Sequence, residues 1–290
     1  MKNSINRKEI DLSFVKYFVL DEADEMLSMG FKSEIDKVLS FTPHDRKIYL
    51  FSATLSERVK KITKTYMKNS LMISVSAANK GADNVNHEYF ICNKNKRYDL
   101  IKNIIDMNKD IYTIIFCRTR RETKEISKRL IRDSYNAKVL NGDLSQTERD
   151  HVMYKFRNKK INILVATDVA SRGIDVDNLS HIINYNLPDD PEIYVHRSGR
   201  TGRAGNSGLS LVFVSKKELQ RLNEIKKLSK ISFKEAIVPT DDDIFKSRVT
   251  TLVDNIINAP TSSTLDTDIL KHLYIRFNKF TKDELIGKII

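Results

Sequence analysis

Residues 194–203 read Tyr-Val-His-Arg-Ser-Gly-Arg-Thr-Gly-Arg, and the interpretation of the whole chain starts from this stretch. It contains Arg197, Arg200 and Arg203 at every third position, with a glycine between each pair. Arginine presents a rigid fork of N–H donors that matches phosphate oxygens, and glycine lets a backbone approach a ligand closely. The stretch therefore predicts a phosphate clamp, although a run of like charges is more usually a solvated basic loop.

Three other segments carry motifs of the same kind. They read Val-Leu-Asp-Glu-Ala-Asp at 19–24, Phe-Ser-Ala-Thr at 51–54 and Ala-Thr-Asp-Val-Ala-Ser-Arg-Gly-Ile-Asp at 166–175. In this order, and followed by residues 194–203, the four segments resemble the motifs of the DEAD-box RNA helicases. One such motif alone is weak, whereas four in order rarely arise by chance. The resemblance implies an ATP-dependent RNA helicase, in which RNA-stimulated ATP hydrolysis is coupled to local unwinding or remodelling of RNA duplexes.

The composition is that of a folded, basic protein. The chain has 290 residues, of which 40% are hydrophobic, so a packed core can form and global disorder is not expected. Lys and Arg number 50 against 38 for Asp and Glu, and the net charge of +12 suits a polyanionic partner such as nucleic acid. On charge alone, a basic protein without any special partner is an equally good interpretation.

The cysteines and the hydropathy of the chain indicate its compartment. Cys92 and Cys117 lie in apolar runs and are too few to staple a fold, so we expect buried thiols in a reducing environment. The first nine residues contain no apolar segment of the kind that directs secretion, and no apolar run approaches the ~20 residues that span a membrane. We therefore expect a cytoplasmic protein.

Two apolar runs near the start of the chain predict strands. Residues 14–20 indicate a strand buried on both faces, as in a parallel sheet, and residues 48–52 predict a second strand. Asp21 and Glu22 follow the first strand, where the ligand sites of such sheets form. Asp21 can hold Mg²⁺ through water against nucleotide phosphates, and Glu22 can orient or deprotonate the attacking water. Alternatively, the acidic residues simply begin the next helix, favoured by its dipole.

The resemblance assigns a coupling role to four residues. It implies that Ser52 and Thr54 link the ATP site to duplex opening through contacts to the acidic motif, which includes Asp24. It also implies that His196 contacts the acidic motif from the other lobe. From the residues alone, two hydroxyls after a strand are as often a helix N-cap, and a histidine of this kind can equally be structural.

A phosphate-binding loop is absent from the sequence. DEAD-box helicases carry Gly-x-x-x-x-Gly-Lys-Ser/Thr before the acidic motif, where backbone N–H groups cradle the phosphates and the lysine neutralises their charge. No Gly-Lys-Ser/Thr occurs in these 290 residues, and no glycine precedes Asp21. We expect residues 1–76 to be the C-terminal remnant of a helicase ATP-binding lobe, in a truncated chain without ATPase activity of its own.

Residues 77–215 alternate strands with helices and predict an α/β domain. Such alternation implies right-handed crossovers and a parallel sheet with helices on both faces. This agrees with the RecA-like second lobe that the resemblance implies, preceded by a partial RecA-like first lobe. The expected strands are 85–92, 111–117, 138–140, 161–166, 181–185 and 209–214, and the expected helices are 97–107, 121–132, 145–158 and 191–199.

Loops and helix starts that follow these strands are the expected RNA contacts. The resemblance implies that they grip the phosphate–sugar backbone of one RNA strand without reading its sequence, since phosphates carry no base information. From the residues alone, Thr119 serves as a helix cap, Gly142 as a turn residue, and Gln146 with Arg149 as a solvated helix face. The implied RNA-binding residues are Arg118, Thr119, Gly142, Asp143, Gln146, Arg149, Thr167 and Arg172.

The resemblance also places part of the ATP site in this lobe. It implies that Gly173 and Asp175 lie at the nucleotide, with Asp175 reaching the ribose. It further implies that Arg200 and Arg203 bind ATP as arginine fingers and stabilise charge on the transferring phosphoryl group. Together with Glu22, and with Mg²⁺ held by Asp21, they would form the catalytic site.

Residues 216–290 follow as a mostly helical extension. We expect a basic helix at 216–230, a strand at 231–238, an amphipathic helix at 240–257 and a helical segment at 266–290. The pattern resembles the extension of bacterial DEAD-box proteins of the cold-shock type, which implies a homodimer formed through this tail. Two other functions stay open for the isolated chain, namely a non-catalytic RNA-binding clamp and an inactive fragment.

Overall fold

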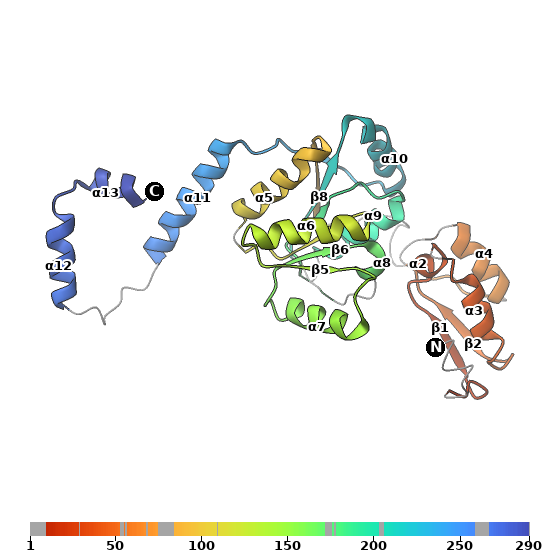
Figure 1. The fold of residues 1–290 in the computed structure, drawn as a ribbon. Helices are drawn as coiled ribbons and strands as arrows, with labels where there is room; N and C mark the ends of the chain where they lie inside the picture. Colours follow the sequence, from red (N-terminus) through yellow and green to blue (C-terminus); the bar gives the residue numbers. More distant parts are fainter. Residues whose placement is uncertain are drawn as a thin grey trace. The chain divides into compact units, whose positions relative to one another are not determined.

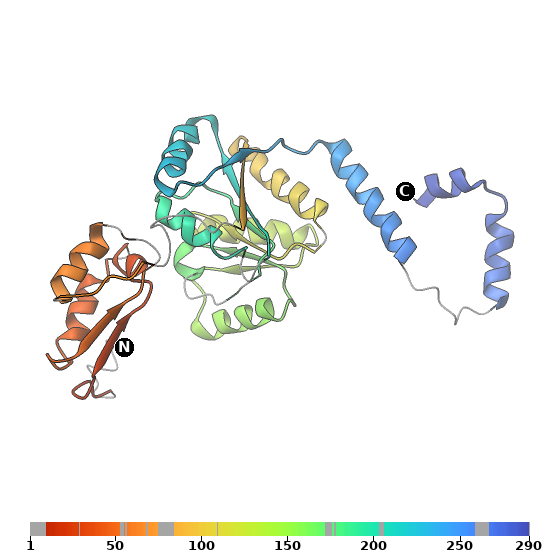
Figure 2. The same cartoon turned by 180° about the vertical axis from the view of Figure 1, so that it is seen from behind.

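The chain consists of two compact units. The computed structural model describes residues 10–28, 30–52, 55, 57–67, 69–74, 84–108, 110–171, 176, 178–202, 206–258 and 267–289. The first unit comprises residues 1–93 and 112–236, and the second comprises 94–111 and 237–290. Figure 1 labels the helices and strands along the ribbon, and Figure 2 gives the view from behind. Both sheets belong to the first unit.

The smaller sheet lies near the start of the chain. Its two parallel strands are β1 (Tyr17–Leu20) and β2 (Lys47–Leu50). Three helices accompany them, α2 (Ala23–Ser28), α3 (Lys32–Leu39) and α4 (Glu57–Tyr66). All of these helices contribute to one small core, which consists of Leu20, Ala23, Leu27, Ile35, Leu39, Val59 and Ile62.

Strand β1 is not buried on both faces, so this part of the sequence-based prediction is wrong. Leu20 is buried, but Tyr17 is 61% exposed and Val19 is 56% exposed. Within the described residues, β1 pairs with β2 alone, and the core of this lobe lies on one face of the pair. An apolar run indicates a fully buried strand only where neighbours cover both faces, and that information is not local.

The larger sheet is entirely parallel and has the strand order β5-β6-β4-β7-β8-β3-β9. Every residue of β4, β6 and β7, three of the five inner strands, is buried. Such strands are apolar on both faces because both faces are covered. The strands are β3 (Val85–Ile91), β4 (Thr113–Phe116), β5 (Ala137–Leu140), β6 (Ile163–Ala166), β7 (His181–Asn184), β8 (Gly208–Val214) and β9 (Lys234–Glu235).

Helices connect these strands, and most of them begin with a side-chain cap. Thr119 forms a capping box with Glu122 at the start of α6, and Ser145 forms one with Glu148 at the start of α7. The helices are α6 (Arg120–Arg132), α7 (Gln146–Arg157), α8 (Asp168–Ser171), α9 (Pro191–Ser198) and α10 (Leu219–Ser229), with a 3₁₀ turn at Lys216–Glu218.

Both faces of the larger sheet are covered, as predicted. Phe156 of α7 packs with Ile114 and Leu164 on one face. Ile115 and Val165 point to the opposite face, because side chains alternate along a strand, and they are fully buried too. Helix α6 contacts β5 and β6. The predicted α/β architecture with a parallel sheet and helices on both faces is therefore confirmed.

The tail differs from expectation in two places. The strand expected at 231–238 is only β9, and Ile237 beyond it is 90% exposed. The segment expected to be helical at 266–290 has a break that was not predicted, between α12 (Thr267–Phe277) and α13 (Lys282–Ile289). The second helix starts afresh because the Thr281 hydroxyl accepts the Glu284 N–H and the Glu284 carboxylate accepts the Thr281 N–H.

In the part that the structure describes, the regular elements of the second unit are helices. Helix α5 (Arg97–Met107) has the predicted bounds, and it contacts α11 (Asp241–Asn258). Helices α12 and α13 also belong to this unit. Among the described residues, no helix combines the length and the apolar character that crossing a membrane requires.

Candidate functional site

The acidic loop directly follows β1 and is fixed against the end of β2. Phe51 donates its N–H to Leu20 O, and Ala23 donates its N–H to Phe51 O. One carboxylate oxygen of Asp21 accepts the N–H of Glu22 at 2.9 Å. Glu22 itself has φ 51°, a left-handed conformation that is unfavourable for a residue with a side chain. The loop thus holds Asp21 and Glu22 in one defined backbone arrangement.

Residues from 194–203 meet this acidic loop. His196 Nε2 lies 3.1 Å from Asp24 Oδ2, and both side chains are largely buried. Arg200 Nη2 lies 3.8 Å from Glu22 Oε1. Two segments that are far apart in the sequence therefore place an imidazole and a guanidinium against two carboxylates of the Asp-Glu-Ala-Asp motif.

Arg197 does not belong to a phosphate clamp, and this corrects the interpretation of the three arginines as one set. Its side chain is 4% exposed and forms a double hydrogen bond with Asp168, at 2.6 and 2.9 Å. Its remaining donor group reaches Asn184 Oδ1 at 2.8 Å and Asn186 O at 3.3 Å. The guanidinium also lies over the ring of Phe116, 4.8 Å from its centroid. Arg197 is an internal tie between α9 and the start of α8.

Gly202 serves the packing of the chain. It has φ +69°, and a Cβ at this position would come within 2.6 Å of Val85 Cγ2 and 3.0 Å of Asn84 O. A side chain there would be strained by the backbone conformation and would collide with β3. Glycine is therefore required at position 202 by the packing of the chain. The sequence had instead suggested that glycine lets a ligand come close to the backbone.

Some predicted residues fall outside the described part of the chain. Ser52 is described, half-buried, just beyond the end of β2. Those that lie outside are Thr54, Arg172, Gly173, Asp175 and Arg203.

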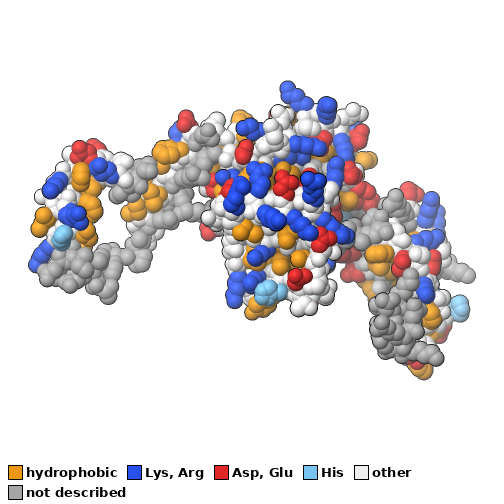
Figure 3. All heavy atoms as spheres, in the orientation of Figure 1, with side chains coloured by type: hydrophobic (Ala, Val, Ile, Leu, Met, Phe, Trp, Pro, Cys, Tyr) orange, Lys and Arg blue, Asp and Glu red, His pale blue; other side chains and the backbone are white. Residues whose placement is uncertain are grey.

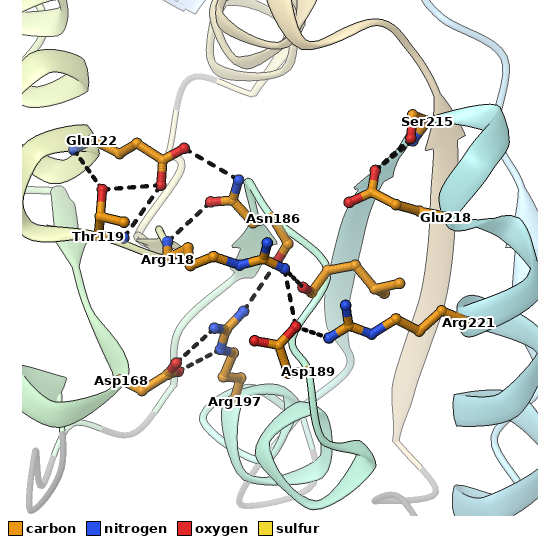
Figure 4. Close-up of polar contacts among 11 residues, drawn as sticks. Arg118, Thr119, Glu122, Asp168, Asn186, Asp189, Arg197, Ser215, Glu218 and Arg221 are labelled. Atoms are coloured by element: carbon orange, nitrogen blue, oxygen red, sulfur yellow. Dashed lines mark hydrogen bonds and ion pairs between the residues drawn. The ribbon is translucent and has the colours of Figure 1, made fainter.

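Arg118 and Thr119 follow β4 and are held by the segment after β7 (Figure 4). Arg118 donates its backbone N–H to Asn186 Oδ1 at 3.0 Å, and its guanidinium donates to Leu187 O and Asp189 Oδ1, both at 3.2 Å. Arg221 of α10 pairs with the same oxygen of Asp189. The hydrogen bond from Arg221 is the main reason that the pKa of the Asp189 carboxyl is below its usual range. The positive charges of Arg118 and Arg221 lower this pKa further.

Thr119 is the N-cap of α6, so the structural alternative considered for it is realised. Its hydroxyl accepts the Glu122 N–H at 3.1 Å, and its own N–H donates to Glu122 Oε2 at 3.2 Å. The hydroxyl proton has only a long contact, 3.4 Å, to the same carboxylate oxygen. The capping role therefore leaves this proton able to turn toward another acceptor.

Gly142 and Asp143 follow β5 and lie beside the start of α6. Asp143 is paired with Lys124 at 2.6 Å and with Arg120 at 2.9 Å, and hydrogen bonding from these two side chains lowers its carboxyl pKa. A Cβ on Gly142 would come within 3.0 Å of the Arg120 guanidinium. The Asp143 charge is thus balanced by cations of α6.

The remaining predicted RNA contacts lie on α7 and after β6. Gln146 and Arg149 are in the first turn of α7, and Gln146 donates to Asp150 at 2.8 Å. Thr167 is nearly buried between β6 and α8. The loops that follow β4, β5, β6 and β7 lie together at the edge of the larger sheet where these strands end. The last residues of the strands are neighbours there, because Phe116 pairs with Ala166 and Asn184, and Leu140 pairs with Ala166.

Exposed Lys and Arg side chains line α6, which begins at this edge. Figure 3 shows them gathered over α6, where the exposed cations are Arg120, Arg121, Lys124, Lys128 and Arg132. Within the described residues, no group of three or more His, Cys, Asp or Glu side chains could enclose a metal ion. The cations of α6 suit the binding of a polyanion. A metal ion would be bound by single carboxylates, such as that of Asp21.

Sequence reasoning missed the polar residues that support these loops. Asn184 and Asn186 anchor Arg197 and Arg118, and Asp189 is shared by Arg118 and Arg221. One signal was available, since two asparagines alternate at the end of an otherwise apolar strand. Polar groups at such buried positions require partners, and the partners come from distant parts of the chain.

Comparisons with known proteins agree along most of the chain. A family model described as helicase conserved C-terminal domain matches residues 96–205, and one described as DEAD/DEAH box helicase matches residues 1–62. The ATP-dependent RNA helicase CshA of Limosilactobacillus reuteri is 41% identical over 256 residues, which cover 88% of this chain and 52% of that protein. The DEAD-box ATP-dependent RNA helicase CshA of Geobacillus kaustophilus is 37% identical, with 88% and 54% covered. The chain thus spans about half the length of the curated relatives it matches.

Solved structures of similar fold include S. cerevisiae Dbp5 bound to RNA and ADP BeF3. Its TM-score with this chain is 0.77 at 31% identity, and the match covers 87% of this chain and 66% of that one. A DEAD box protein from the hyperthermophile Methanococcus jannaschii has a TM-score of 0.52 at 41% identity, covering 81% of this chain and 63% of that one.

Proposed function

This chain belongs to the DEAD/DEAH box family of helicases, and on that premise we propose that it supplies the RNA-gripping lobe and part of the nucleotide site of an ATP-dependent RNA helicase. In the proposed cycle, ATP and single-stranded RNA hold two lobes together. The bound strand is bent away from duplex geometry, and nearby base pairs open. Hydrolysis of ATP then lets the lobes separate and releases the RNA.

The meeting of residues 194–203 with the acidic loop is the observation that carries the proposal. His196 reaches Asp24 at 3.1 Å and Arg200 faces Glu22 at 3.8 Å, so residues of the arginine-rich stretch and of the acidic motif converge on one place. We assign Glu22 to orient or deprotonate the attacking water. Arg200 and Arg203 neutralise charge on the phosphoryl group, and Gly173 and Asp175 hold the nucleotide.

Asp21 is the residue that we propose for Mg²⁺. This ion keeps several of its waters and is usually held by one or two carboxylates together with substrate phosphates. A single exposed carboxylate at the end of a parallel strand fits that requirement, whereas a closed cage of ligands is not needed. When bound, the ion would neutralise phosphate charge. Asp24, Ser52, Thr54 and His196 would couple this site to the RNA.

The RNA strand would lie along the sheet edge that carries Arg118, Thr119, Gly142, Asp143, Gln146, Arg149 and Thr167. Arg172, which lies outside the described residues, would also contact it. The hydroxyl proton of Thr119 can turn from Glu122 toward a phosphate oxygen, and the cations of α6 attract the polyanion. The Dbp5 structure that this chain resembles is bound to RNA. Contacts of this kind are blind to sequence.

A second function, RNA binding without catalysis, is favoured for the 290-residue chain taken alone. It contains no Gly-Lys-Ser/Thr, and the lysine and backbone cradle of that motif are what hold the phosphates of ATP in such enzymes. We therefore propose that the isolated chain binds RNA and does not hydrolyse ATP.

Two measurements on the purified chain test this pair of functions. In a fluorescence anisotropy titration, the chain should bind a labelled single-stranded RNA with an affinity that falls as salt rises, by about 0.7 logarithmic unit per unit of log salt for each phosphate neutralised. ATP hydrolysis should equal that of the Glu22→Gln variant, with or without RNA. RNA-stimulated turnover that Glu22→Gln abolishes would refute the inactivity of the chain, and no RNA binding at low salt would refute the RNA function.

The catalytic assignments need the missing motif to be supplied. Fusing the P-loop half of Geobacillus kaustophilus CshA to the start of this chain should give RNA-stimulated ATP hydrolysis. In that fusion, Arg200→Ala should lower kcat by about 10³-fold or more. Arg157→Ala, at an exposed arginine at the end of α7, is the matched control and should leave kcat unchanged. Equal kcat for the fusion and its Arg200→Ala variant would contradict the role of the arginine.

A homodimer through the tail remains part of the proposal. Helices α11 and α12 expose large apolar side chains, among them Phe245, Ile257, Tyr274 and Ile275. Exposed apolar side chains in such numbers favour association. Sedimentation at high micromolar concentration should detect a dimer, and a strictly monomeric species would argue against it.

A further inference from the structure

Asn186 lies where strands β4 and β7 separate. The ladder between them pairs Phe116 with Asn184, and Tyr185 donates its N–H to Phe116 O. Beyond this point, the N–H of Arg118 is accepted by the side-chain oxygen of Asn186, at 3.0 Å. The asparagine amide thus takes the place of a backbone acceptor and continues the pairing past the end of the strands.

The orientation of the Asn186 amide is set by its neighbours. A backbone N–H only donates, so the oxygen must face Arg118 and the NH₂ group must face the other way. There the NH₂ group donates to Glu122 Oε1 at 3.4 Å. Glu122 is the residue whose other carboxylate oxygen accepts the N–H of Thr119. The side chain of Asn186 therefore supports both residues of the loop after β4.

The backbone of Asn186 connects this loop to a second anchor. Its carbonyl accepts from Arg197 at 3.3 Å, and Arg197 is locked onto Asp168 by two hydrogen bonds. Figure 4 shows the resulting series of contacts, which runs from Thr119 through Glu122 and Asn186 to Arg197 and Asp168. Asn186 is buried, so its own hydrogen bonds are at least partly shielded from solvent. In such surroundings hydrogen bonds are strong and unpaired polar groups are unfavourable.

We propose that Asn186 is a positioning residue for RNA binding, which holds Arg118 and Thr119 in the geometry that grips the RNA backbone and ties them to helix α9. This inference rests on the proposed RNA function of the loop. Asn186 itself does not touch RNA. It acts through the N–H of Arg118 and through Glu122, and its removal should misplace Thr119 without removing any charge.

A double-mutant cycle separates this role from the RNA function itself. Thr119→Val removes the hydroxyl proposed to meet phosphate, and in anisotropy titrations it should weaken binding of labelled single-stranded RNA by about fivefold, the worth of one hydrogen bond. Asn186→Ala should weaken binding by a similar factor. The double variant should bind no worse than about twofold below either single variant, because both changes remove the same contact.

The outcomes distinguish the two hypotheses. If Thr119→Val binds as the unchanged chain does, the RNA function of the loop is wrong, and the role of Asn186 falls with it. If Thr119→Val weakens binding while Asn186→Ala does not, or if their effects multiply in full, the RNA function stands and the positioning role is wrong.

A charge-balanced rescue covers the case in which Asn186→Ala does not fold. Asn186→Asp faces a new carboxylate toward Glu122 and should weaken RNA binding. Adding Glu122→Gln restores a donor–acceptor pair, keeps the capping box and returns the net charge to its original value. The double variant should recover affinity to within about twofold of the unchanged chain. Failure to recover, in a protein that folds with an unchanged melting temperature, would overturn the proposal.

Asn184→Ala is the matched control. Asn184 is fully buried two residues away, and it binds Arg197 and Leu211 O but not the loop after β4. Its loss should lower the melting temperature while leaving RNA affinity within about twofold, since a hydrogen bond is lost from the core alone. A loss of affinity equal to that of Asn186→Ala would indicate a general structural effect and contradict the specific role of Asn186.

Discussion

Strands β1 and β4 are both short, apolar and parallel to their neighbours, and each leads into a loop assigned to function, but they differ in burial. All four residues of β4 are buried between β6 and β7. In β1, Tyr17 and Val19 are more than half exposed, and within the described residues β2 is its one strand partner. Similar local sequences therefore have different environments, and the difference arises from what surrounds the strand.

The two strands also belong to lobes that differ in how much apolar surface they bury. The lobe around β1 has a small core to which three helices contribute, whereas the second lobe buries several strands completely. Local opening needs little free energy where few apolar contacts are lost. We therefore expect the acidic loop to be carried by the less stable lobe, and the loops proposed to bind RNA by the more stable one.

Amide hydrogen exchange should give the largest contrast. The N–H groups of β4 and β6 should exchange only by global unfolding, and those of β1 and β2 should exchange at least about 100-fold faster by local opening. Mass spectrometry of peptides from residues 14–75 and 111–166 would measure both. Equal protection of the amides in the two regions would contradict the expected difference in local stability.

Lowering the pH should destabilise the second lobe selectively. Burial lowers the pKa of His87 to about 4, so between about pH 6.5 and 4 the unfolded chain binds a proton that the folded chain excludes. Stability is therefore full above pH 6.5 and is lost as the pH falls through this window, by at most about 3 kcal/mol.

The matched variant isolates the contribution of His87. Urea unfolding at pH 7 and pH 5 should give a smaller pH dependence for His87→Gln than for the unchanged chain. His181, whose pKa is also lowered by burial, should account for part of the slope that remains. An identical pH dependence in both proteins would show that His87 does not titrate in this way.

One valine from each lobe sharpens the contrast further. Val165 in β6 is fully buried and Val19 in β1 is 56% exposed. Val165→Ala should lower the free energy of unfolding by about 2 kcal/mol, through lost burial and a residual cavity. Val19→Ala should change it by less than about 0.5 kcal/mol, as exposed substitutions do. Chemical denaturation followed by circular dichroism measures both, and equal effects would refute the assigned difference in packing.

The smallest effect concerns Asp189, the counter-ion that two arginines share at the loop proposed to bind RNA. Asp189 pairs with both Arg118 and Arg221 in an exposed position, so Asp189→Asn should change stability by less than about 1 kcal/mol. It should raise RNA affinity a few-fold and steepen its salt dependence, because two arginines lose a competing carboxylate. Asp133→Asn, at an ion pair near the end of α6, is the control. Weaker RNA binding by Asp189→Asn would show that the carboxylate assists binding.

Many elements of residues 77–215 could be predicted because the sequence signals for helices and strands are local. Helix α5 has the predicted bounds, and Thr119 was recognisable as a cap from its position before an amphipathic run. The break before α13 was also readable, since Thr281 is followed three residues later by Glu284. That signal was missed because the apolar pattern continues on both sides of it.

The supporting contacts of the site could not be predicted in the same way. The sequence presents Arg197 and Arg200 as equivalent, but α9 ends at Ser198, so Arg197 lies inside the helix and Arg200 beyond it. Only the fold brings Asp168 to Arg197 and Asn186 to Arg118. The exposure of β1 depends likewise on neighbours that no local pattern encodes.

The position of β3 in the larger sheet bears on how the protein is made. Val85–Ile91 pairs, residue by residue, with Gly208–Val214, which a ribosome completes much later. At about 5–20 residues per second, β3 waits on the order of ten seconds for this partner, as a strand with unpaired edges. Helices α6 and α7 can form in the meantime, because their caps are local. We therefore expect β3 to be exposed to association until β8 emerges, and a stall in translation before Gly208 should leave an aggregation-prone intermediate.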